Sequence, residues 1–220
     1  VVRGKAQPDF FDRAKIREIA KKGVQKVINE GSWKDFRCFG TTQNVGWNAS
    51  IGGLPTRNFS MGDFVEKEKI SAETYVENMM DKPGTCFACV QSCKRDIKEG
   101  IEEPYKIEAR YGGPEYETIG MLGSNCMVSD LHSIAKANEI ASKYGVDTIT
   151  MGAVISFIME CYENNLIDND LFPGIDLHFG NQEAIVKMAE MIVTRDGFGF
   201  EMGEGVDRLS KKIGEESQKF

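Results

Sequence analysis

The sequence predicts a mainly α-helical, multihelical domain with loop-rich segments around a group of cysteines. Apolar residues recur at helical spacing in several stretches that begin with capping residues, whereas the alternation typical of β-strands is scarce. Glycine and proline gather on either side of the cysteines, where they favour loops. With 220 residues, of which 41% are apolar, the chain is long enough to bury a substantial core.

The first predicted element is an amphipathic helix over residues 9–31. Asp9 is expected to cap it, apolar side chains from Ile16 to Ile28 share one face, and Gly31 is expected to end it. Residues 32–58 break this pattern with repeated glycines, a proline and several large aromatic residues. We therefore expect a long, loop-rich connection there, whose aromatic side chains either belong to a functional loop or fill the core.

Shorter elements are expected around the cysteines. Ser71 can cap a helix that runs through Met80, and Pro83-Gly84 then predicts a turn. Residues 104–118 mix tyrosine and isoleucine with glycine and proline, which suggests an extended stretch followed by a turn.

Helices are expected to dominate the C-terminal half. A turn is expected at Phe172-Pro173-Gly174. The expected helices cover residues 130–144, residues 148–164, a stretch that Asn181 caps, and residues 204–216. Gly145 is a typical stop for the first of them, and the second is apolar almost all round, as buried helices are.

The charge and the N-terminal residues bound the function. The net charge is -7 and no basic stripe with interleaved aromatic residues occurs, so a nucleic-acid partner is not expected. The longest apolar stretch, residues 149–159, is too short to span a bilayer. Residues 1–5 lack both an initiator Met and the apolar core of a signal peptide. We expect an internal part of a longer, cytoplasmic protein with no membrane association.

Three of the six cysteines form the run Cys86-x-x-Cys89-x-x-x-Cys93. Thiolates at this spacing can converge on one soft metal centre, and a 4Fe–4S cluster with three local ligands and one distant ligand fits best. A zinc site is a second interpretation, although the only histidines, His132 and His178, are far apart and unpaired. Redox-active or structural cysteines are a third, and no βαβ pattern supports a thioredoxin-like pair.

The other cysteines, Cys38, Cys126 and Cys161, are scattered, and such residues are usually small buried hydrophobic side chains. Without a secretory signal, a disulfide framework is not expected. Lys94 and Arg95 follow the cysteine run directly. Positive charge there would favour a reduced, anionic cluster, whereas the alternative interpretation places both side chains on the plain surface.

Several short motifs accompany the cysteine run in a fixed order. They are Gly53-Leu-Pro-Thr-Arg-Asn-Phe59, Cys86 to Cys93, Gly112-Gly-Pro-Glu-Tyr-Glu-Thr118, Gly123-Ser-Asn-Cys126 and Tyr144-Gly-Val-Asp-Thr-Ile149. The set closely resembles the tungsten-containing aldehyde:ferredoxin oxidoreductases, and the resemblance covers essentially the whole chain. It implies that residues 9–220 form the helical middle domain of that family. Residues 1–8 would then be the end of the preceding domain or a linker.

The resemblance implies the cofactors and partners of the parent protein. A tungsten, occasionally molybdenum, centre held by two pterin dithiolenes is expected between the domains, with a 4Fe–4S cluster close by. The implied partners are an aldehyde substrate, ferredoxin and the flanking pterin-saddle and C-terminal domains, and a homodimer is compatible with the resemblance. Cys86, Cys89 and Cys93 match the first three cluster ligands, and the fourth would come from the C-terminal domain.

The resemblance also implies residues beside the tungsten centre. Glu117 matches an acidic residue near the metal and would activate water or accept a proton if burial raises its pKa; the alternative is an ordinary surface carboxylate. The family's pterin-binding motif begins at Ser142, which replaces an Asp, and includes Gly145 and Asp147. Asp147 is equally expected as the N-cap of the next helix, and Thr148 would line the substrate side.

Two functions of different classes follow. The parent protein would be an oxidoreductase that converts an aldehyde to a carboxylate, or a relative that acts reductively on an aromatic acyl thioester. The chain alone would be a non-catalytic helical domain that binds a cluster or zinc, and we expect it to be inactive without its flanking domains.

Overall fold

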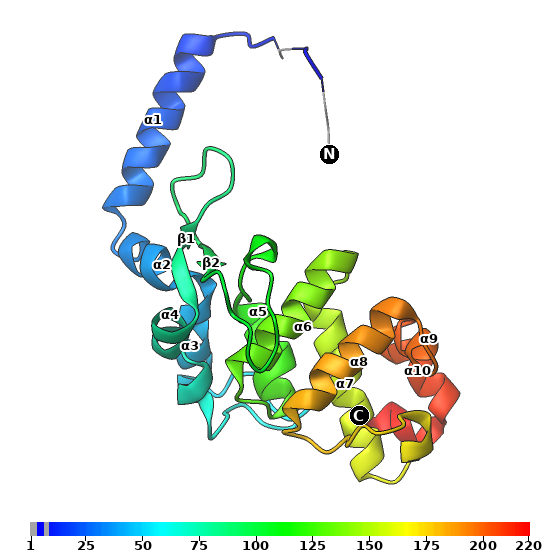
Figure 1. Ribbon diagram of the computed structural model, residues 1–220. Coiled ribbons are helices and arrows are strands. Elements are labelled where there is room, and N and C mark those ends of the chain that lie inside the picture. The colour runs from blue at the N-terminus through cyan, green and yellow to red at the C-terminus, as the bar shows by residue number, and fades with distance from the viewer. Residues whose placement is uncertain (1–3, 7–8) are drawn as a thin grey trace.

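A computed structural model of the chain describes residues 4–6 and 9–220. Most of these residues lie in helices, which confirms the predicted mainly α-helical fold (Figure 1). The α-helices in chain order are α1 (Arg13–Asn29), α2 (Trp33–Phe39), α3 (Asn44–Ser50), α4 (Ala72–Asn78), α5 (Tyr116–Thr118), α6 (Leu131–Tyr144), α7 (Thr148–Glu163), α8 (Gln182–Thr194), α9 (Gly199–Met202) and α10 (Val206–Ile213). Within the described residues, one two-stranded antiparallel sheet pairs β1 (Met80–Gly84) with β2 (Lys94–Ile97). The linker expected at residues 1–8 lies largely outside the described residues and stays a prediction.

Helix α7 runs through the core, as its apolar composition predicts. Its buried side chains include Val154, Ile155 and Ile158, and it packs against α6, α8 and a π-helical segment at Ile119–Gly123. Figure 1 shows α6, α7 and α8 grouped at the centre, with α9 and α10 beyond them and α2 to α4 on the opposite side. None of the helices in the described part of the chain is long and apolar enough to cross a membrane.

Local signals at the ends of these three helices are confirmed. Asp130 and Asp147 each accept a hydrogen bond from a backbone N–H in the first turn of α6 and α7, at 2.8 and 2.7 Å. Asn181 accepts two such bonds at the start of α8. Gly145 ends α6 with a φ of 73°, in the left-handed region that glycine adopts at least cost.

Helix α7 approaches the π-helical segment closely at Gly152. A Cβ atom at this position would lie 2.6 Å from the backbone carbonyl oxygen of Met121, far inside van der Waals contact. A second contact joins the starts of the two elements. The hydroxyl of Thr118, directly before the π-helical segment, lies 2.8 Å from the hydroxyl of Thr148, the first residue of α7. Gly152 therefore helps to set the position of α7 on which the candidate site depends.

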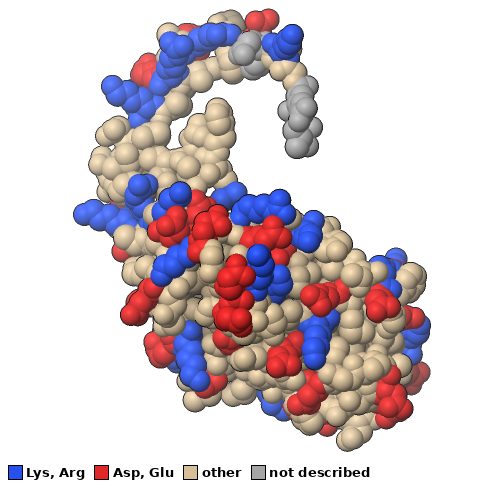
Figure 2. Space-filling view, in the orientation of Figure 1, with Lys and Arg blue, Asp and Glu red and all other residues tan. Residues whose placement is uncertain are grey.

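Helix α1 differs from the prediction at its start and in its surroundings. Asp12, rather than Asp9, caps it, because the Asp12 carboxylate accepts a hydrogen bond from the backbone N–H of Lys15 at 2.9 Å. No residue of α1 is buried, and Ile16 and Ile19 on its apolar face are 46% and 60% exposed. Figure 2 shows α1 standing away from the rest of the molecule. The predicted amphipathic pattern is present, but its apolar face is not buried.

The loop expected at residues 32–58 is wrong in part, because α2 and α3 lie within it. A 3-10 turn at Gly40–Gln43 links these two helices. Each helix has only seven residues, which is too short for a clear apolar period and too short to be stable alone. Val45 and Ala49 of α3 are buried, so packing in the folded chain stabilises this segment.

Two expectations next to the cysteines also need correction. Ser71 caps α4 as predicted, but the expected turn at Pro83-Gly84 lies in strand β1. Proline is tolerated there because each strand of a two-stranded sheet has one edge without a partner strand. Residues 104–118 contain short helical turns, Ala109–Tyr111 and α5, in place of the expected extended stretch.

The C-terminal end of the chain follows the prediction only in outline. The turn expected at residues 172–174 is present. The last predicted helix, residues 204–216, is shorter than expected, because α10 is flanked by Gly205 and Gly214 with φ values of 88° and 134°. Glu215–Lys219 then forms a separate 3-10 turn.

Candidate functional site

The three cysteines of the run lie on one loop that joins β1 to β2, residues 85–93, which we call the cysteine loop (Figure 1). The antiparallel pairing of the two strands holds the ends of the loop together. Cys86 and Cys89 are exposed and Cys93 is partly buried. One short, closed segment therefore presents all three thiols.

Hydrogen bonds within the cysteine loop fold its first half into a tight turn. The backbone N–H of Cys89 donates to the carbonyl oxygen of Cys86 at 3.1 Å, and the Thr85 hydroxyl donates to the carbonyl oxygen of Cys89 at 2.7 Å. Ala88 and Ser92 have left-handed φ values of 56° and 53°. This backbone conformation is unfavourable for residues with side chains, so the surrounding contacts must hold the loop in shape.

Those contacts come from helix α2 and from strand β2. The indole Nε1 of Trp33 donates to the carbonyl oxygen of Val90 at 3.2 Å. The Arg37 guanidinium donates to the hydroxyl of Ser92 at 3.2 Å, and that of Arg95 donates to the carbonyl oxygen of Ser92 at 2.7 Å. The second half of the cysteine loop is thus fixed to α2 just before Cys93.

The thiols of the cysteine loop are suitable donors for a soft metal centre. Across residues 4–6 and 9–220, no three His, Cys, Asp or Glu side chains are placed to hold a single metal ion. A zinc ion needs its ligands within about 2.3 Å of one point, whereas the thiolates of a 4Fe–4S cluster bind different iron atoms and so lie farther apart. Three thiols on one loop, two exposed and one partly buried, provide the donor type that such a cluster uses.

The other cysteines fall into two environments. Cys126 and Cys161 are buried in the core, as predicted, and burial raises the pKa of both thiols, to about 12 for Cys161. Both therefore stay protonated at neutral pH and act as small hydrophobic side chains. Cys38 is exposed at the end of α2, so the expectation of burial is wrong for this residue.

The residues that were predicted to lie beside a metal and a pterin gather where α6 ends and α7 begins. Glu117 is exposed on α5, next to Thr118, whose hydroxyl contacts that of Thr148 at 2.8 Å. Gly145 and Asp147 lie in the exposed connection between α6 and α7. The Asp147 carboxylate accepts bonds from the backbone N–H and the hydroxyl in the first turn of α7, and these bonds lower its pKa. Asp147 is therefore an N-cap, as one of the two interpretations predicted.

A half-buried carboxyl group in this region, which the sequence did not reveal, belongs to Glu115. Glu115 is half-buried and accepts a hydrogen bond from the hydroxyl of Thr41, and the backbone N–H of Tyr116 donates to the same hydroxyl at 3.0 Å. Burial raises the pKa of Glu115, and the charge of Glu117 adds to the effect. Burial was expected at Glu117 but is found at Glu115, the N-cap of α5. The two side chains are two positions apart in the chain and so face in different directions.

A cavity of about 590 Å³ lies between strand β2 and helix α6. Lys94 and Arg95 of β2 line it, together with Asn138 and Ser142 of α6. Glu115 also lines this cavity. Strand β2, which follows the cysteine loop, and helix α6 therefore share one space, lined largely by charged and polar side chains, although none of the three loop cysteines lines it.

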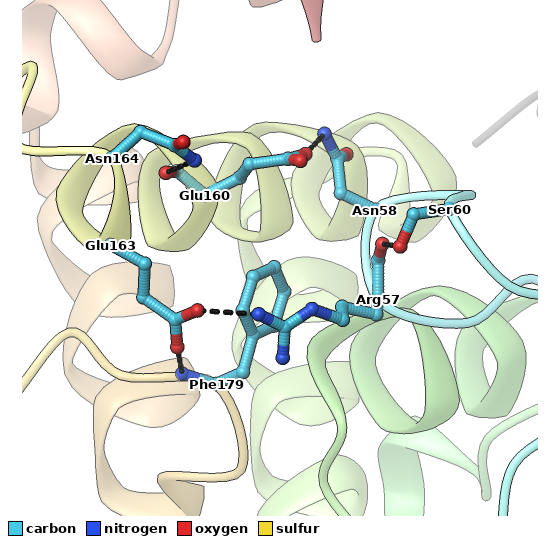
Figure 3. A network of polar contacts seen from close by, with 7 residues as sticks. All are labelled: Arg57, Asn58, Ser60, Glu160, Glu163, Asn164 and Phe179. Atoms are coloured by element: carbon cyan, nitrogen blue, oxygen red, sulfur yellow. Dashed lines mark hydrogen bonds and ion pairs between the residues drawn. The ribbon is translucent and has the colours of Figure 1, made fainter.

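The segment from Arg57 to Phe59 lies outside this cavity and is anchored on α7 (Figure 3). Its three residues have left-handed φ values of 49°, 46° and 62°. Figure 3 shows Arg57 reaching Glu163 at 2.7 Å and Asn58 reaching Glu160 at 2.5 Å. These contacts give the segment a structural explanation, namely the attachment of an unfavourable turn to the central helix.

Comparisons with known proteins agree on one family. The family model described as "Aldehyde ferredoxin oxidoreductase, domains 2 & 3" matches residues 18–220. A tungsten-containing aldehyde ferredoxin oxidoreductase of Pyrococcus horikoshii is 33% identical over 218 residues, which is 97% of this chain and 35% of that protein. A protein of Pyrococcus furiosus named as the WOR-like subunit of an aliphatic sulfonate oxidoreductase is 25% identical, over 91% of this chain and 33% of that protein.

A solved structure has the same fold. The active-site complex BamBC of benzoyl coenzyme A reductase, in complex with 1,5-dienoyl-CoA, matches 92% of this chain and 32% of its own chain with a TM-score of 0.61. The sequence identity is 17%, so this likeness concerns the fold alone. The chain spans about a third of the length of the relatives that it matches.

Proposed function

The chain belongs to the aldehyde ferredoxin oxidoreductase family, and we propose that its parent protein oxidises an aldehyde to a carboxylate with ferredoxin as electron acceptor. In this proposal the chain supplies three ligands of a 4Fe–4S cluster and one wall of a tungsten–pterin site. The observation that carries the proposal is the closed loop that presents Cys86, Cys89 and Cys93, in a chain whose residues 18–220 match this family.

Cys86, Cys89 and Cys93 are the proposed cluster ligands. Their loop is held on α2 by contacts to the backbone and side chain around Ser92, so its shape depends on the folded domain as well as on the metal. The fourth ligand would come from the part of the parent protein outside these 220 residues. When bound, the tungsten centre supplies a Lewis acid that accepts two electrons, and the cluster passes electrons on singly.

The carboxyl groups of this chain would handle the protons. Oxidation of an aldehyde with oxygen from water releases protons along with the two electrons, so a nearby base is required. We assign Glu117 of α5 and Thr148 of α7 to the substrate side, because Thr118, the neighbour of Glu117, contacts the hydroxyl of Thr148. Glu115 is a second acceptor, since burial raises its pKa towards the range in which a carboxylate accepts protons effectively. Asp147 and Gly145, both exposed between α6 and α7, are the proposed pterin contacts.

We also propose that the parent protein is cytoplasmic. A cluster with thiolate ligands suits the cytoplasm, where cysteines are kept reduced.

Reduction of an aromatic acyl thioester is the second candidate activity, and the fold shared with benzoyl coenzyme A reductase supports testing it.

The test uses the full-length parent protein, purified without oxygen from cells supplied with tungstate. We expect a panel of aldehydes to be oxidised to carboxylates with reduction of ferredoxin or a viologen dye. Cys93→Ser is expected to abolish electron transfer to ferredoxin, while Cys38→Ser, which alters an exposed cysteine outside the cysteine loop, is expected to preserve it. Reduction of an acyl thioester without aldehyde oxidation would favour the second candidate. A preparation with full tungsten and iron content and neither activity would contradict both.

A further inference from the structure

Lys94 and Arg95 are neighbours in sequence but occupy opposite environments. Lys94 is exposed, whereas Arg95 is 1% exposed and is one of the largest fully buried side chains described. Burying a guanidinium group is costly unless its charge and its hydrogen-bond donors are satisfied. The partners of Arg95 therefore indicate what the residue is for.

The guanidinium of Arg95 joins helix α2 to the cysteine loop. Its Nη1 donates to the carbonyl oxygens of Arg37 at 3.0 Å and Cys38 at 2.8 Å. Its Nη2 donates to the carbonyl oxygens of Phe36 at 3.2 Å and Ser92 at 2.7 Å. The first three carbonyls belong to the last turn of α2, which carries partial negative charge. Phe36 also accepts from the backbone N–H of Gly40 at the end of the helix. One side chain thus links the end of α2 to the residue before Cys93.

The backbone at Gly40 packs tightly against this group. Gly40, with a φ of 62°, lies directly against it: a Cβ atom there would be 2.4 Å from the carbonyl oxygen of Cys93 and 2.7 Å from Nε of Arg95. On the other side, the backbone N–H of Gly113 donates to the carbonyl oxygen of Arg95 at 2.9 Å. The position of Arg95 is therefore fixed from both sides.

The charge of Arg95 is not matched by a carboxylate in the part of the chain that the structure describes. No Asp or Glu described here forms an ion pair with it, and its Nε is buried without a hydrogen-bond partner. Glu115 is the strongest anionic influence on Arg95, but burial disfavours the charged form of that carboxyl. A buried cation whose acceptors are uncharged, namely carbonyl oxygens and the thioether sulfur of Met80, calls for a further anion nearby.

We propose that Arg95 is a positioning residue for the cluster site, which fixes the second half of the cysteine loop on α2 and provides the buried positive charge that balances the cluster thiolates. The inference rests on the proposed cluster at Cys86, Cys89 and Cys93. It separates two roles of one side chain. The planar fork of the guanidinium shapes the loop, and its charge stabilises the reduced, more negative cluster.

Two substitutions distinguish the roles. Arg95→Gln removes the charge, and we expect the equilibrium constant for cluster reduction to fall by on the order of tenfold, the effect of one unit charge about 10 Å away at an effective dielectric constant of about 20. For one electron, tenfold corresponds to a midpoint potential about 59 mV lower. Arg95→Lys keeps the charge but not the fork, so we expect a smaller change in midpoint and faster amide exchange in the cysteine loop. Lys94→Gln is the matched control, because an exposed charge is screened by solvent and salt.

The experiment is a redox titration followed by electron paramagnetic resonance on the full-length parent protein, with hydrogen exchange of residues 85–93 measured on the same samples. A lower midpoint for Arg95→Gln than for Lys94→Gln supports the inference. Equal midpoints in two cluster-loaded variants, with unchanged exchange in the loop, overturn it. If Arg95→Gln loses the cluster, Arg95→Lys decides: faster loop exchange supports the inference and unchanged exchange overturns it. A wild-type protein without a cluster signal would instead overturn the proposed function.

Discussion

Replacing Gly152 by Ala would insert a methyl group where α7 meets the π-helical segment. The added carbon would lie 2.6 Å from both the backbone carbon and the backbone oxygen of Met121, and 2.7 Å from the Cβ of that residue. Two of these atoms are backbone, so they cannot rotate out of the way as the end of a flexible side chain would. The helix or the segment has to move.

The size of the effect follows from two opposing contributions. Alanine favours a helix interior over glycine by about 1 kcal/mol. Overpacking a dense core costs about 1–3 kcal/mol, and the backbone contacts place this case at the upper end. The net result is a loss of about 2 kcal/mol of local stability, which corresponds to roughly 30-fold faster amide exchange if exchange follows local opening.

Hydrogen exchange read by mass spectrometry measures this effect in peptides from α7 and from residues 119–126. Gly46→Ala is the matched control, because Gly46 lies in helix α3 and no atom comes within 4 Å of a Cβ placed there. That substitution is expected to slow exchange or leave it unchanged. Slower or unchanged exchange in α7 of Gly152→Ala would refute the close approach and, with it, our explanation of how Thr118 and Thr148 are brought together.

Two further predictions concern carboxyl groups of the candidate site. Asp147→Ala is expected to cost about 1 kcal/mol at the start of α7, because it removes the cap. Asp147→Asn keeps the cap, so loss of tungsten from Asp147→Asn would reveal a role of the carboxylate that is separate from capping. Because the pKa of Asp147 is lowered, its stabilising effect is present above the ordinary aspartate pKa of 3.8 and is lost as the pH falls through the lower folded-state pKa. Glu115 has a raised pKa, so its protonated form favours folding and this advantage is lost as the pH rises above 4.5. Thermal unfolding of Glu115→Gln should therefore show a gain over the wild type that grows above this pH, and a constant difference would contradict the assignment.

The long helices could be predicted because their signals are local. Asp130, Asp147 and Asn181 each precede an apolar stretch, and each forms the expected cap. Helix α1 shows the limit of this reasoning, since Asp9 and Asp12 are both acceptable caps and lie three residues apart. Backbone geometry at Asp12, with a φ of -144°, decides between them.

The short elements could not be predicted because distant contacts stabilise them. Helices α2 and α3 have seven residues each and depend on packing and on side chains such as Arg95, which lies more than 50 residues from the carbonyls that it binds. Pro83 pairs with Arg95 in a strand although proline and glycine together usually indicate a turn. The hairpin that carries the cysteines was therefore absent from the prediction, while the cysteines themselves were identified.

The candidate carboxyl groups and cations were likewise predictable only in part. The sequence places Glu115 and Glu117 in one motif and Lys94 and Arg95 side by side. Which member of each pair is buried depends on partners elsewhere in the chain, such as Thr41 for Glu115. Chemical type was therefore predictable from the sequence, but burial required the fold.

The most direct test of the account is the metal content and the paramagnetic resonance spectrum of the full-length parent protein with single cysteine substitutions. We predict about four iron atoms and a cubane signal in the wild type and in Cys38→Ser, and loss of both in Cys86→Ser, Cys89→Ser and Cys93→Ser. The account would be contradicted if the three variants kept their iron and their signal, or if the wild type bound zinc stoichiometrically in place of iron.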